Sequence, residues 1–331
     1  MEKISENKSK ILVIGATGMI GRFLVSASIK AGHPTFMLVR TNTVATDHDK
    51  AKLVEDFKSR GVVVVTGDVH DHGSLVGAFK QVDVVISAVG HKFREQLADQ
   101  IKIIRAIKEA GNVKRFLPSE FGSDVEHVEL VEPAASVLHT KTELRQVIRE
   151  EGIPHTFVCS NCFQGFFLPR FGQPEAEHPP TDKVIILGDG NPQAIFVNEN
   201  DMGAYTIKAV DDPRTLNKTL FISPPANFYS LNQLVSLWEK KIGRTLEKIH
   251  VSEEDVLKKI QESSYPLSFQ FAIAYSVFVK GELTNRAIDP SIAVEATELY
   301  PEIKYVKVED YLDCIMFSLM SFCDFTKRKL R

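Results

Sequence analysis

The stretch ILVIGATGMIGR, residues 11–22, decides the fold that we expect for this chain. A short apolar run leads into three glycines, Gly15, Gly18 and Gly21, and an amphipathic stretch follows them. Glycines at this spacing between a strand and a helix are typical of a turn that binds a dinucleotide pyrophosphate. The first permits the tight turn, the second the approach of the ligand, and the third close packing of helix on strand. The expected cofactor contacts here are Gly15, Thr17, Gly18, Met19, Ile20 and Gly21.

Five further short apolar runs follow the first one and are separated by helical stretches. They lie at residues 35–39, 62–66, 84–89, 115–119 and 155–160. Because each run is apolar throughout, each is expected to be a strand buried on both faces of a parallel sheet. The succession predicts an α/β fold, a doubly wound parallel sheet of the Rossmann-like kind with a second, smaller α/β substrate domain.

The regular alternation ends after residue 160, where the chain becomes rich in proline and glycine. We predict a nucleotide-binding domain over residues 8–160, to which the chain returns near 194–210. Residues 161–313 are predicted to form mainly the substrate-binding domain. Residues 314–331 are an atypical tail, either a docking helix or, as we favour, an artefact of reading into non-coding sequence.

The composition is that of an ordinary globular protein, with 331 residues, 44% of them hydrophobic, and a net charge of -3. This charge argues against a nucleic-acid partner or a membrane surface. No apolar run is long enough to span a bilayer, and the polar start is unlike a signal peptide. We therefore expect a cytoplasmic protein.

Cysteine and histidine pairs raise the question of a metal or redox site. Cys159 and Cys162 are two of only four cysteines, and they close an apolar strand, which favours buried structural thiols. His70 and His72 flank an aspartate, but a turn before a helix explains them better than a metal does. We expect no metal.

The second apolar run indicates which dinucleotide binds. Arg40 follows it at the point where an NAD site carries an acidic residue, and a guanidinium suits a 2′-phosphate. Lys50 or Lys52 is expected to add a second positive charge. We predict NADPH rather than NADH. The ends of the next strands are expected to contact the same cofactor, through Ser87, Ala88, Ser119 and Phe121.

Lys141 lies within the apolar face of a helix expected over residues 136–149. Lysine often lays its stem on apolar surface and lifts its ammonium group into water. The alternative is that its head points into a cleft, where burial lowers its pKa and makes it a proton acceptor. Val137 occupies the position where many dehydrogenases of this fold carry a tyrosine, which disfavours their alcohol–ketone chemistry.

Several motifs along residues 10–313 resemble the plant isoflavone-reductase-like family, an NmrA-like group of atypical short-chain dehydrogenases. They include GATGMIG, QVDVVISAVG, KRFLPSEFG, EGIPHTFVCSNCF, VFVKGELTN and EATELYPEIKY. Among its members, phenylcoumaran benzylic ether reductases look most similar. The resemblance implies an NADPH-dependent reductase of phenylpropanoid phenolics. We expect further cofactor contacts at Asn161 and Phe163, and a homodimer is possible.

The family resemblance also implies a role for Lys141 as the general base. It would deprotonate a 4-hydroxyphenyl group, so that the benzylic oxygen leaves, a quinone methide forms, and a hydride from NADPH adds to it. The small phenolic substrate needs an aromatic pocket, for which we expect Phe166, Phe167, Phe271 and Tyr275. About half of the aromatic residues in these segments are expected to be core instead.

Three features depart from the family pattern: an extended loop at 91–95, Tyr275 in place of a histidine, and the tail. Isoflavone reductase, pinoresinol–lariciresinol reductase and eugenol or isoeugenol synthase activities therefore stay open. An alternative of another class is a non-catalytic regulator that senses NADP(H).

Overall fold

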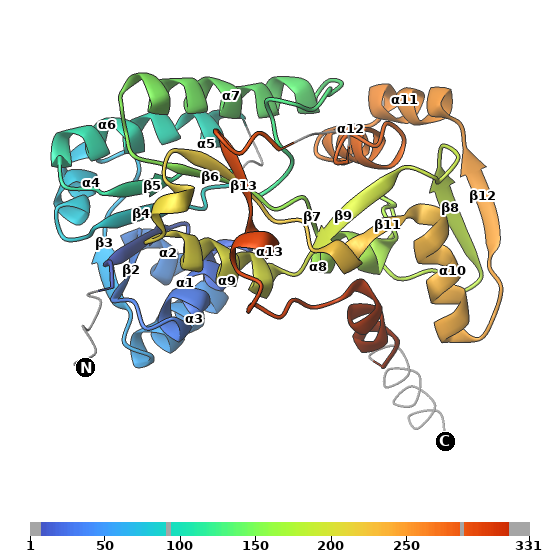
Figure 1. The fold of residues 1–331 in the computed structure, drawn as a ribbon, viewed down its shortest axis with the longest axis horizontal. Helices are drawn as coiled ribbons and strands as arrows, with labels where there is room; N and C mark the ends of the chain where they lie inside the picture. The colour runs from blue at the N-terminus through green and yellow to red at the C-terminus, as the bar shows by residue number, and fades with distance from the viewer. Residues whose placement is uncertain (1–7, 91–93, 285–287, 318–331) are drawn as a thin grey trace.

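The N-terminal part of the chain folds around a parallel β-sheet (Figure 1). The computed structural model describes residues 8–90, 94–284 and 288–317. The sheet has the strand order β3-β2-β1-β4-β5. Its strands are β1 (Ile11–Ile14), β2 (Thr35–Val39), β3 (Val63–Thr66), β4 (Val84–Ser87) and β5 (Arg115–Leu117). Because the strand order reverses between β1 and β4, a crevice opens at their carboxyl ends.

Helices cover both faces of this sheet, which confirms the predicted doubly wound fold. Ile11 and Val13 pack on one side, and Leu12 and Ile14 pack on the other. The first side is covered by α1 (Gly21–Lys30), α3 (His48–Ser59) and α9 (Glu199–Ala209). The second is covered by α4 (His72–Phe79), α6 (Gln100–Ala110) and α7 (Ala134–Glu150). The short helices α2 (Thr41–Thr46) and α5 (Arg94–Ala98) follow β2 and β4.

One expectation about the strands is wrong. The sequence predicted that residues 62–66 are buried on both faces, but β3 is the edge strand and the side chain of Val63 is 47% exposed. The run is rich in valine because β-branched residues suit a strand, at an edge as well as in the centre. Composition alone therefore did not distinguish an edge strand from a central one.

Parallel pairing continues beyond β5. The order β13-β10-β6 joins β6 (Thr156–Cys159), β10 (Lys218–Phe221) and β13 (Ala293–Glu295), all parallel. A single bridge between Phe116 and His155 links β6 to β5. The late strand β10 thus lies beside the last strand of the predicted nucleotide-binding domain, β13 lies beside β10, and α9 packs on α1. The division of the chain into two domains stays a prediction.

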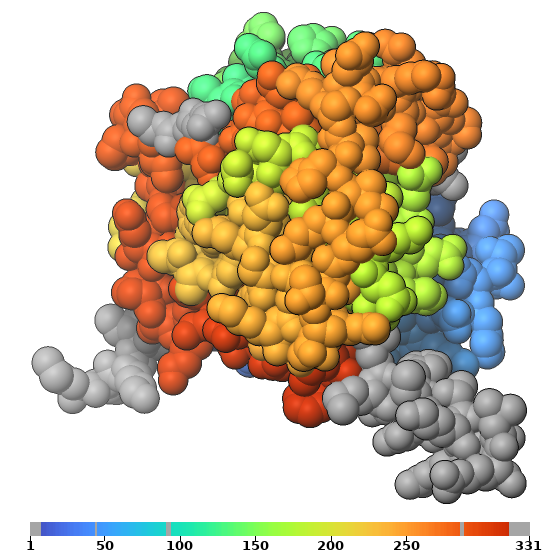
Figure 2. Space-filling view, turned by 90° about the vertical axis from the view of Figure 1, so that its right-hand side faces the viewer, coloured from blue at the N-terminus to red at the C-terminus, as the bar shows by residue number. Residues whose placement is uncertain are grey.

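The remaining elements form the other end of the molecule around Trp238, whose indole N–H donates to the carbonyl oxygen of Pro180 (2.8 Å). In the space-filling view of this end, β12 and α10 form much of the surface (Figure 2). One sheet contains β7 (Cys162–Phe163), β9 (Gln193–Val197) and β11 (Phe228–Ser230), and another contains β8 (Lys183–Leu187) and β12 (Glu247–Val251). The helices here are α8 (Gln164–Phe167), α10 (Leu231–Ile242), α11 (Glu253–Glu262) and α12 (Leu267–Phe278). The short helix α13 (Ala296–Leu299) follows β13 and packs instead in the core on the α1 side of the N-terminal sheet. Short 3-10 turns span Leu168–Arg170, Pro213–Thr215 and Pro225–Asn227.

The atypical tail begins inside a helix. Residues 308–317 are helical, and Val308 and Leu312 are buried in the same core as Trp238. Residues 318–331 lie outside the described part of the chain, so the hypothesis about the tail stays open. Among the described residues, no helix combines the length and apolar character needed to cross a membrane.

Candidate functional site

A cleft of about 390 Å³ lies at the carboxyl ends of β1 and β4. Of the predicted cofactor residues it is lined by Gly15, Thr17, Gly18, Arg40, Lys50 and Ala88. Gly15 has a φ of +77°, and a Cβ there would lie 2.4 Å from the carbonyl oxygen of Ala88. A Cβ on Gly21 would lie 2.1 Å from the carbonyl oxygen of Gly15. The backbone is therefore packed so closely at both positions that only glycine fits.

The rest of the glycine-rich turn lies beside the cleft. Gly21 is buried at the start of α1, while Met19 is half exposed. Met19, Ile20 and Gly21 are not among the residues that line the cleft. Their predicted contacts with a cofactor stay predictions.

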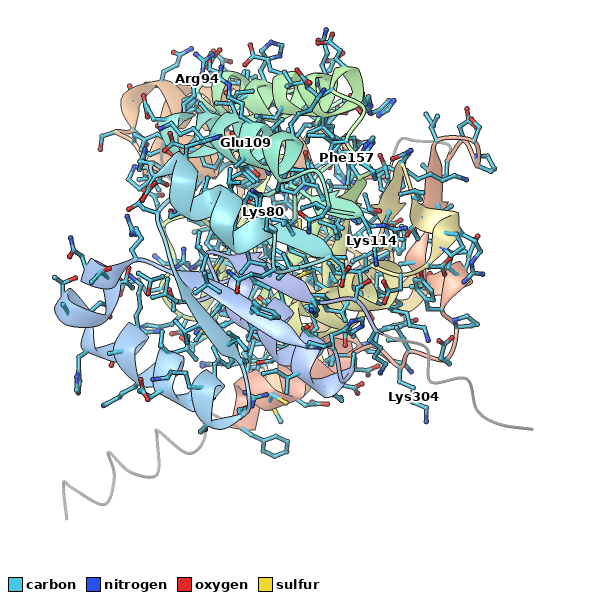
Figure 3. The ribbon with its side chains drawn as sticks, turned by 90° about the vertical axis from the view of Figure 1, so that its left-hand side faces the viewer. Lys80, Arg94, Glu109, Lys114, Phe157 and Lys304 are labelled. Atoms are coloured by element: carbon cyan, nitrogen blue, oxygen red, sulfur yellow. The ribbon has the colours of Figure 1, made fainter. Side chains whose placement is uncertain are left out.

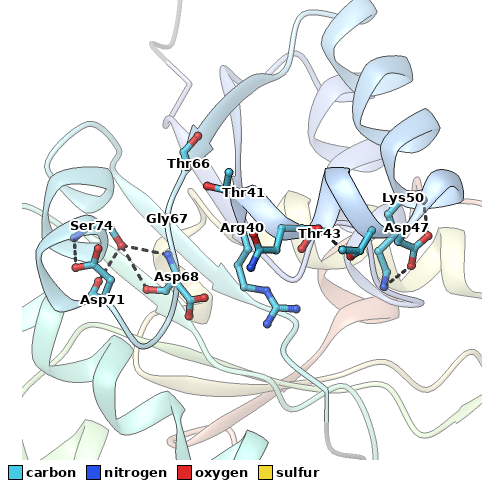
Figure 4. Close-up of a pocket in the computed structure, with 12 residues that line it drawn as sticks. Arg40, Thr41, Thr43, Asp47, Lys50, Thr66, Gly67, Asp68, Asp71 and Ser74 are labelled. Atoms are coloured by element: carbon cyan, nitrogen blue, oxygen red, sulfur yellow. Dashed lines mark hydrogen bonds and ion pairs between the residues drawn. The ribbon is translucent and has the colours of Figure 1, made fainter.

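The cleft continues into a polar hollow beyond β2, where Arg40 and Lys50 lie (Figure 4). The Arg40 side chain extends between the segment of Asp68 and the first turn of α3. Lys50 Nζ lies 2.8 Å from Asp47 Oδ2, and the Asp47 side chain also caps α3 by accepting from the backbone N–H of Lys50. Of the two lysines considered from the sequence, Lys50 lines this hollow and Lys52 does not. Two cations beside a dinucleotide cleft suit a 2′-phosphate.

At the carboxyl edge of the sheet, a hydrogen bond joins the segments that follow β4 and β5. The Ser119 hydroxyl donates to the carbonyl oxygen of Val89 (2.9 Å), and its backbone N–H donates to Gln100 Oε1 (2.7 Å). The buried Ser87 hydroxyl has no hydrogen-bond partner among the described residues. Ser87 is fully buried and does not line the cleft, so its predicted contact with a cofactor stays a prediction.

Two residues with left-handed backbone join the end of β5 to the end of β6. Phe121 has a φ of +45° and Asn161 a φ of +53°, a conformation that costs about 1–3 kcal/mol for a residue other than glycine. The N–H of Phe121 donates to the carbonyl oxygen of Val158, and that of Asn161 to the carbonyl oxygen of Gly122. Asn161 Oδ1 is buried without a partner among the described residues. Phe163 follows on β7 and is also buried.

Lys141 is buried on α7, with 5% of its surface exposed. Its Nζ donates a 2.6 Å hydrogen bond to the backbone carbonyl oxygen of Glu120, the residue between Ser119 and Phe121. The ammonium group therefore does not reach into water, and the surface alternative considered from the sequence is wrong. Burial lowers the pKa of Lys141, although the charge of Glu120 acts in the opposite direction. Lys141 lines none of the clefts named in this section.

A buried arginine next to Lys141 was missed from the sequence. The Arg145 side chain is fully buried and pairs with Glu120, Asp124 and Glu126. Its position four residues after Lys141 places it on the same helix face. Two basic residues within one apolar face, preceded by three acidic residues in SEFGSDVEH, were the available signal.

The aromatic residues expected around a substrate separate into two places. Phe166 and Phe167 line a small cavity together with Gln270 and Ala274 of α12. Phe271 lies under the Lys259 ammonium group, 5.3 Å from the ring centroid. The Tyr275 hydroxyl donates to Glu253 Oε1 (2.6 Å), and burial raises its pKa to about 12. Their roles in substrate binding stay predictions.

The extended loop lies partly outside the described residues, which omit 91–93. The described part begins α5, whose Arg94 donates from Nε to the Thr140 hydroxyl (3.2 Å). Figure 3 labels Arg94, which belongs to α5, and Phe157, which belongs to β6. Gln96 of the same short helix lines the cofactor cleft. The segment after β4 thus spans from the cleft to the residue that precedes Lys141.

The cysteines and histidines considered as metal ligands from the sequence are either buried as thiols or paired with other side chains. Cys159 and Cys162 are both buried, and burial raises the pKa of the Cys162 thiol. His70 lies beside Asp99 and Lys102, and His72 beside Glu109. Among the described residues, no group of three or more His, Cys, Asp or Glu side chains is arranged to hold a metal ion.

Comparison with known proteins identifies similar chains along almost the whole length. The NmrA-like family model matches residues 7–312. Eugenol synthase 2 of Clarkia breweri is 63% identical over 93% of this chain and 98% of its own. Phenylcoumaran benzylic ether reductase Betv6 of Betula pendula is 61% identical over 92% of this chain and 98% of its own. The structure of AtPrR2 with NADP+ and (+)-pinoresinol superposes with a TM-score of 0.87 at 41% identity, over 93% of this chain and 99% of its own.

Proposed function

The chain belongs to the NmrA-like family, and from this membership we propose that it is an NADPH-dependent reductase of phenylpropanoid-derived phenolics. It is an oxidoreductase with NADPH as its cofactor, as the names and bound ligands of its relatives support. Gly15 and Gly18 of the glycine turn line the cleft proposed for the pyrophosphate, and Arg40 with Lys50 suits the 2′-phosphate. A cytoplasmic location and a homodimer stay predictions.

The observation that carries the reaction type is the burial of Lys141 against the carbonyl oxygen of Glu120. Burial lowers the pKa of Lys141 and so favours the neutral amine, the form that accepts a proton from a phenol. Deprotonation of a 4-hydroxyphenyl group drives electrons through the ring and expels the benzylic oxygen, which leaves a quinone methide. NADPH, when bound, supplies hydride to this chemistry. Val137, in place of a tyrosine, agrees with a reaction in which no carbonyl oxygen needs a proton.

Among substrates, we propose a phenylcoumaran, whose benzylic ether is opened. Eugenol synthase chemistry on a coniferyl ester is the second candidate, because a eugenol synthase is as similar to this chain as the ether reductase is. Both reactions need the same base and the same cofactor, so the shape of the substrate pocket separates them. One or two side chains suffice to redirect such a choice.

The test is NADPH oxidation by purified protein with dehydrodiconiferyl alcohol, pinoresinol, an isoflavone and coniferyl acetate in parallel. Lys141→Met removes the amine and keeps an apolar stem of similar length. We expect turnover of dehydrodiconiferyl alcohol, its loss in Lys141→Met, and unchanged NADPH affinity in both proteins. Lys52→Met is the control, since Lys52 does not line the cleft. Tight NADPH binding without turnover of any compound would favour the regulator that senses NADP(H) instead.

A further inference from the structure

Arg145 has no access to solvent and lies one helical turn after Lys141 on α7. Its guanidinium grips the Glu120 carboxylate with two hydrogen bonds, from Nε to Oε1 (3.1 Å) and from Nη2 to Oε2 (2.9 Å). The backbone carbonyl oxygen of the same glutamate accepts the hydrogen bond from Lys141 Nζ. One residue, Glu120, therefore connects the two basic side chains through two different groups.

The remaining donors of Arg145 form hydrogen bonds mainly with the segment that follows β5. Nη1 donates to Asp124 Oδ1 (2.8 Å) and to Glu126 Oε2 (2.9 Å), and Nη2 donates to Cys159 Sγ (3.5 Å). The guanidinium also lies 4.8 Å from the Phe157 ring centroid. A planar fork with five donors makes this set of contacts, and a lysine ammonium group does not. Arg145 thus holds residues 120–126 against α7.

We propose that Arg145 is the positioning residue of Lys141, holding the Glu120 carbonyl oxygen in place and neutralising the Glu120 carboxylate beside the lysine. The proposal rests on the proposed function, in which Lys141 is the base. The charged and titratable groups that act on Lys141 are Glu120 from the segment after β5, Arg145 from its own helix and Cys159 from β6. Glu120 favours the charged ammonium form, and Arg145 opposes it. Without Arg145, an uncompensated carboxylate would favour the protonated form of Lys141.

The experiment follows the protonation of Lys141 directly and through the reaction. The chain is labelled with ¹³C,¹⁵N-lysine, and the Lys141 signal is identified as the one missing from Lys141→Met. Its titration is recorded in the wild type, Arg145→Met, Arg145→Lys and Glu120→Gln. In parallel, kcat is measured against pH with dehydrodiconiferyl alcohol and with coniferyl acetate. Arg115→Met is the matched control, because Arg115 is also buried but binds the carbonyl oxygens of Ala209 and Asp212 instead.

The charge-changing variants are expected to move the titration of Lys141 in opposite directions. In Arg145→Met its proton-binding constant should rise about tenfold, and the rising limb of kcat should move to higher pH. In Glu120→Gln the titration of Lys141 and the rising limb of kcat should both move to lower pH. Arg115→Met should reduce resistance to urea and leave the titration of Lys141 and the pH dependence of kcat unchanged.

Arg145→Lys separates geometry from charge. It keeps the positive charge and loses the fork, so kcat should fall about tenfold with little movement of the titration. A fall in kcat, rather than a rise in KM, is expected because substrate contacts are untouched.

An unchanged Lys141 titration in Arg145→Met and Glu120→Gln, or shifts in the same direction, would overturn the proposal. So would full kcat in Arg145→Lys. If Arg145→Met does not fold, Glu120→Gln and Arg145→Lys decide between these outcomes. If the titrations shift as expected but the wild type reduces neither substrate, Arg145 still controls Lys141, and it is the proposed function that fails.

Discussion

Lys50 Nζ lies 2.8 Å from Asp47 Oδ2 in the hollow that Arg40 also lines. This pairing neutralises much of the lysine charge, whereas within the described part of the chain no carboxylate forms an ion pair with Arg40. The same carboxylate caps α3, which places Lys50 at the first turn of that helix. Of the two cations, Arg40 is therefore the better recognition group for a 2′-phosphate.

Arg40→Ala should reduce the preference for NADPH over NADH by about tenfold to hundredfold, because a charge-assisted contact to phosphate is lost. Lys50→Ala should reduce it less, since Asp47 already shares that charge. The dissociation constants of both nucleotides measure the effect. Lys52→Ala serves as the control, and an unchanged ratio in Arg40→Ala would refute NADPH recognition by this residue.

Gly21→Ala should lower the free energy of unfolding by about 2–3 kcal/mol, because the new methyl group overlaps the carbonyl oxygen of Gly15. Urea denaturation measures the change. Gly77→Ala is the matched control: Gly77 is an exposed glycine within α4, and a Cβ there meets no atom within 4 Å. This control should be neutral or slightly stabilising, since alanine favours a helix. Equal stability of the two variants would contradict the close packing of α1 on β1.

The raised pKa of Asp201 predicts that the free energy of unfolding depends on pH. Burial raises its pKa to about 6, above the value of about 4 in an unfolded chain. The folded protein therefore retains a proton that the unfolded chain releases, and stability is lost as pH rises from about 4 to 6. Asp201→Asn removes this loss while its amide oxygen still accepts from the Val306 N–H.

Asp201→Asn should therefore be more stable than the wild type at pH 8, by at most about 2–3 kcal/mol, and equal to it near pH 4. Urea denaturation at both pH values measures this difference. The exposed Asp182 offers the control substitution Asp182→Asn, with no such pH-dependent gain expected. A gain of the same size at both pH values would rule out the titration of Asp201 as its cause.

Phe167→Ala should raise KM for the phenolic substrate about tenfold, if the Phe167 ring packs on an aromatic ring of that substrate, and leave NADPH affinity unchanged. Phe171→Leu is the control, because Phe171 packs on Trp238 in the same core without lining the small cavity of Phe166 and Phe167. Steady-state kinetics with dehydrodiconiferyl alcohol measures both variants. Equal KM values in Phe167→Ala and the wild type would move the search for the pocket to Phe271 and Tyr275.

The local pattern around residues 11–22 was sufficient to predict the fold of the N-terminal part. Strand, glycine turn and helix are adjacent in the chain there, so hydrophobic periodicity and glycine spacing report directly on the backbone. The same holds for the helix of Lys141, expected over 136–149 and observed over Ala134–Glu150. Apart from Lys50 in α3, the predicted cofactor residues that line the cleft come from turns directly after strands, whose position in a parallel sheet follows from the order of elements.

Tertiary structure decided what depends on contacts between distant segments. The edge position of β3 and the pairing of β10 and β13 beside β6 have no local signature. Nor does the sequence show that the Tyr275 hydroxyl meets Glu253, or that Glu120 joins Lys141 to Arg145. A basic residue in an apolar helix face is ambiguous by itself, because its energy depends on the partners that the fold brings to it. The sequence by itself determined that Lys141 stands in an apolar face, and the buried carboxylates and carbonyl oxygens around it decided its environment.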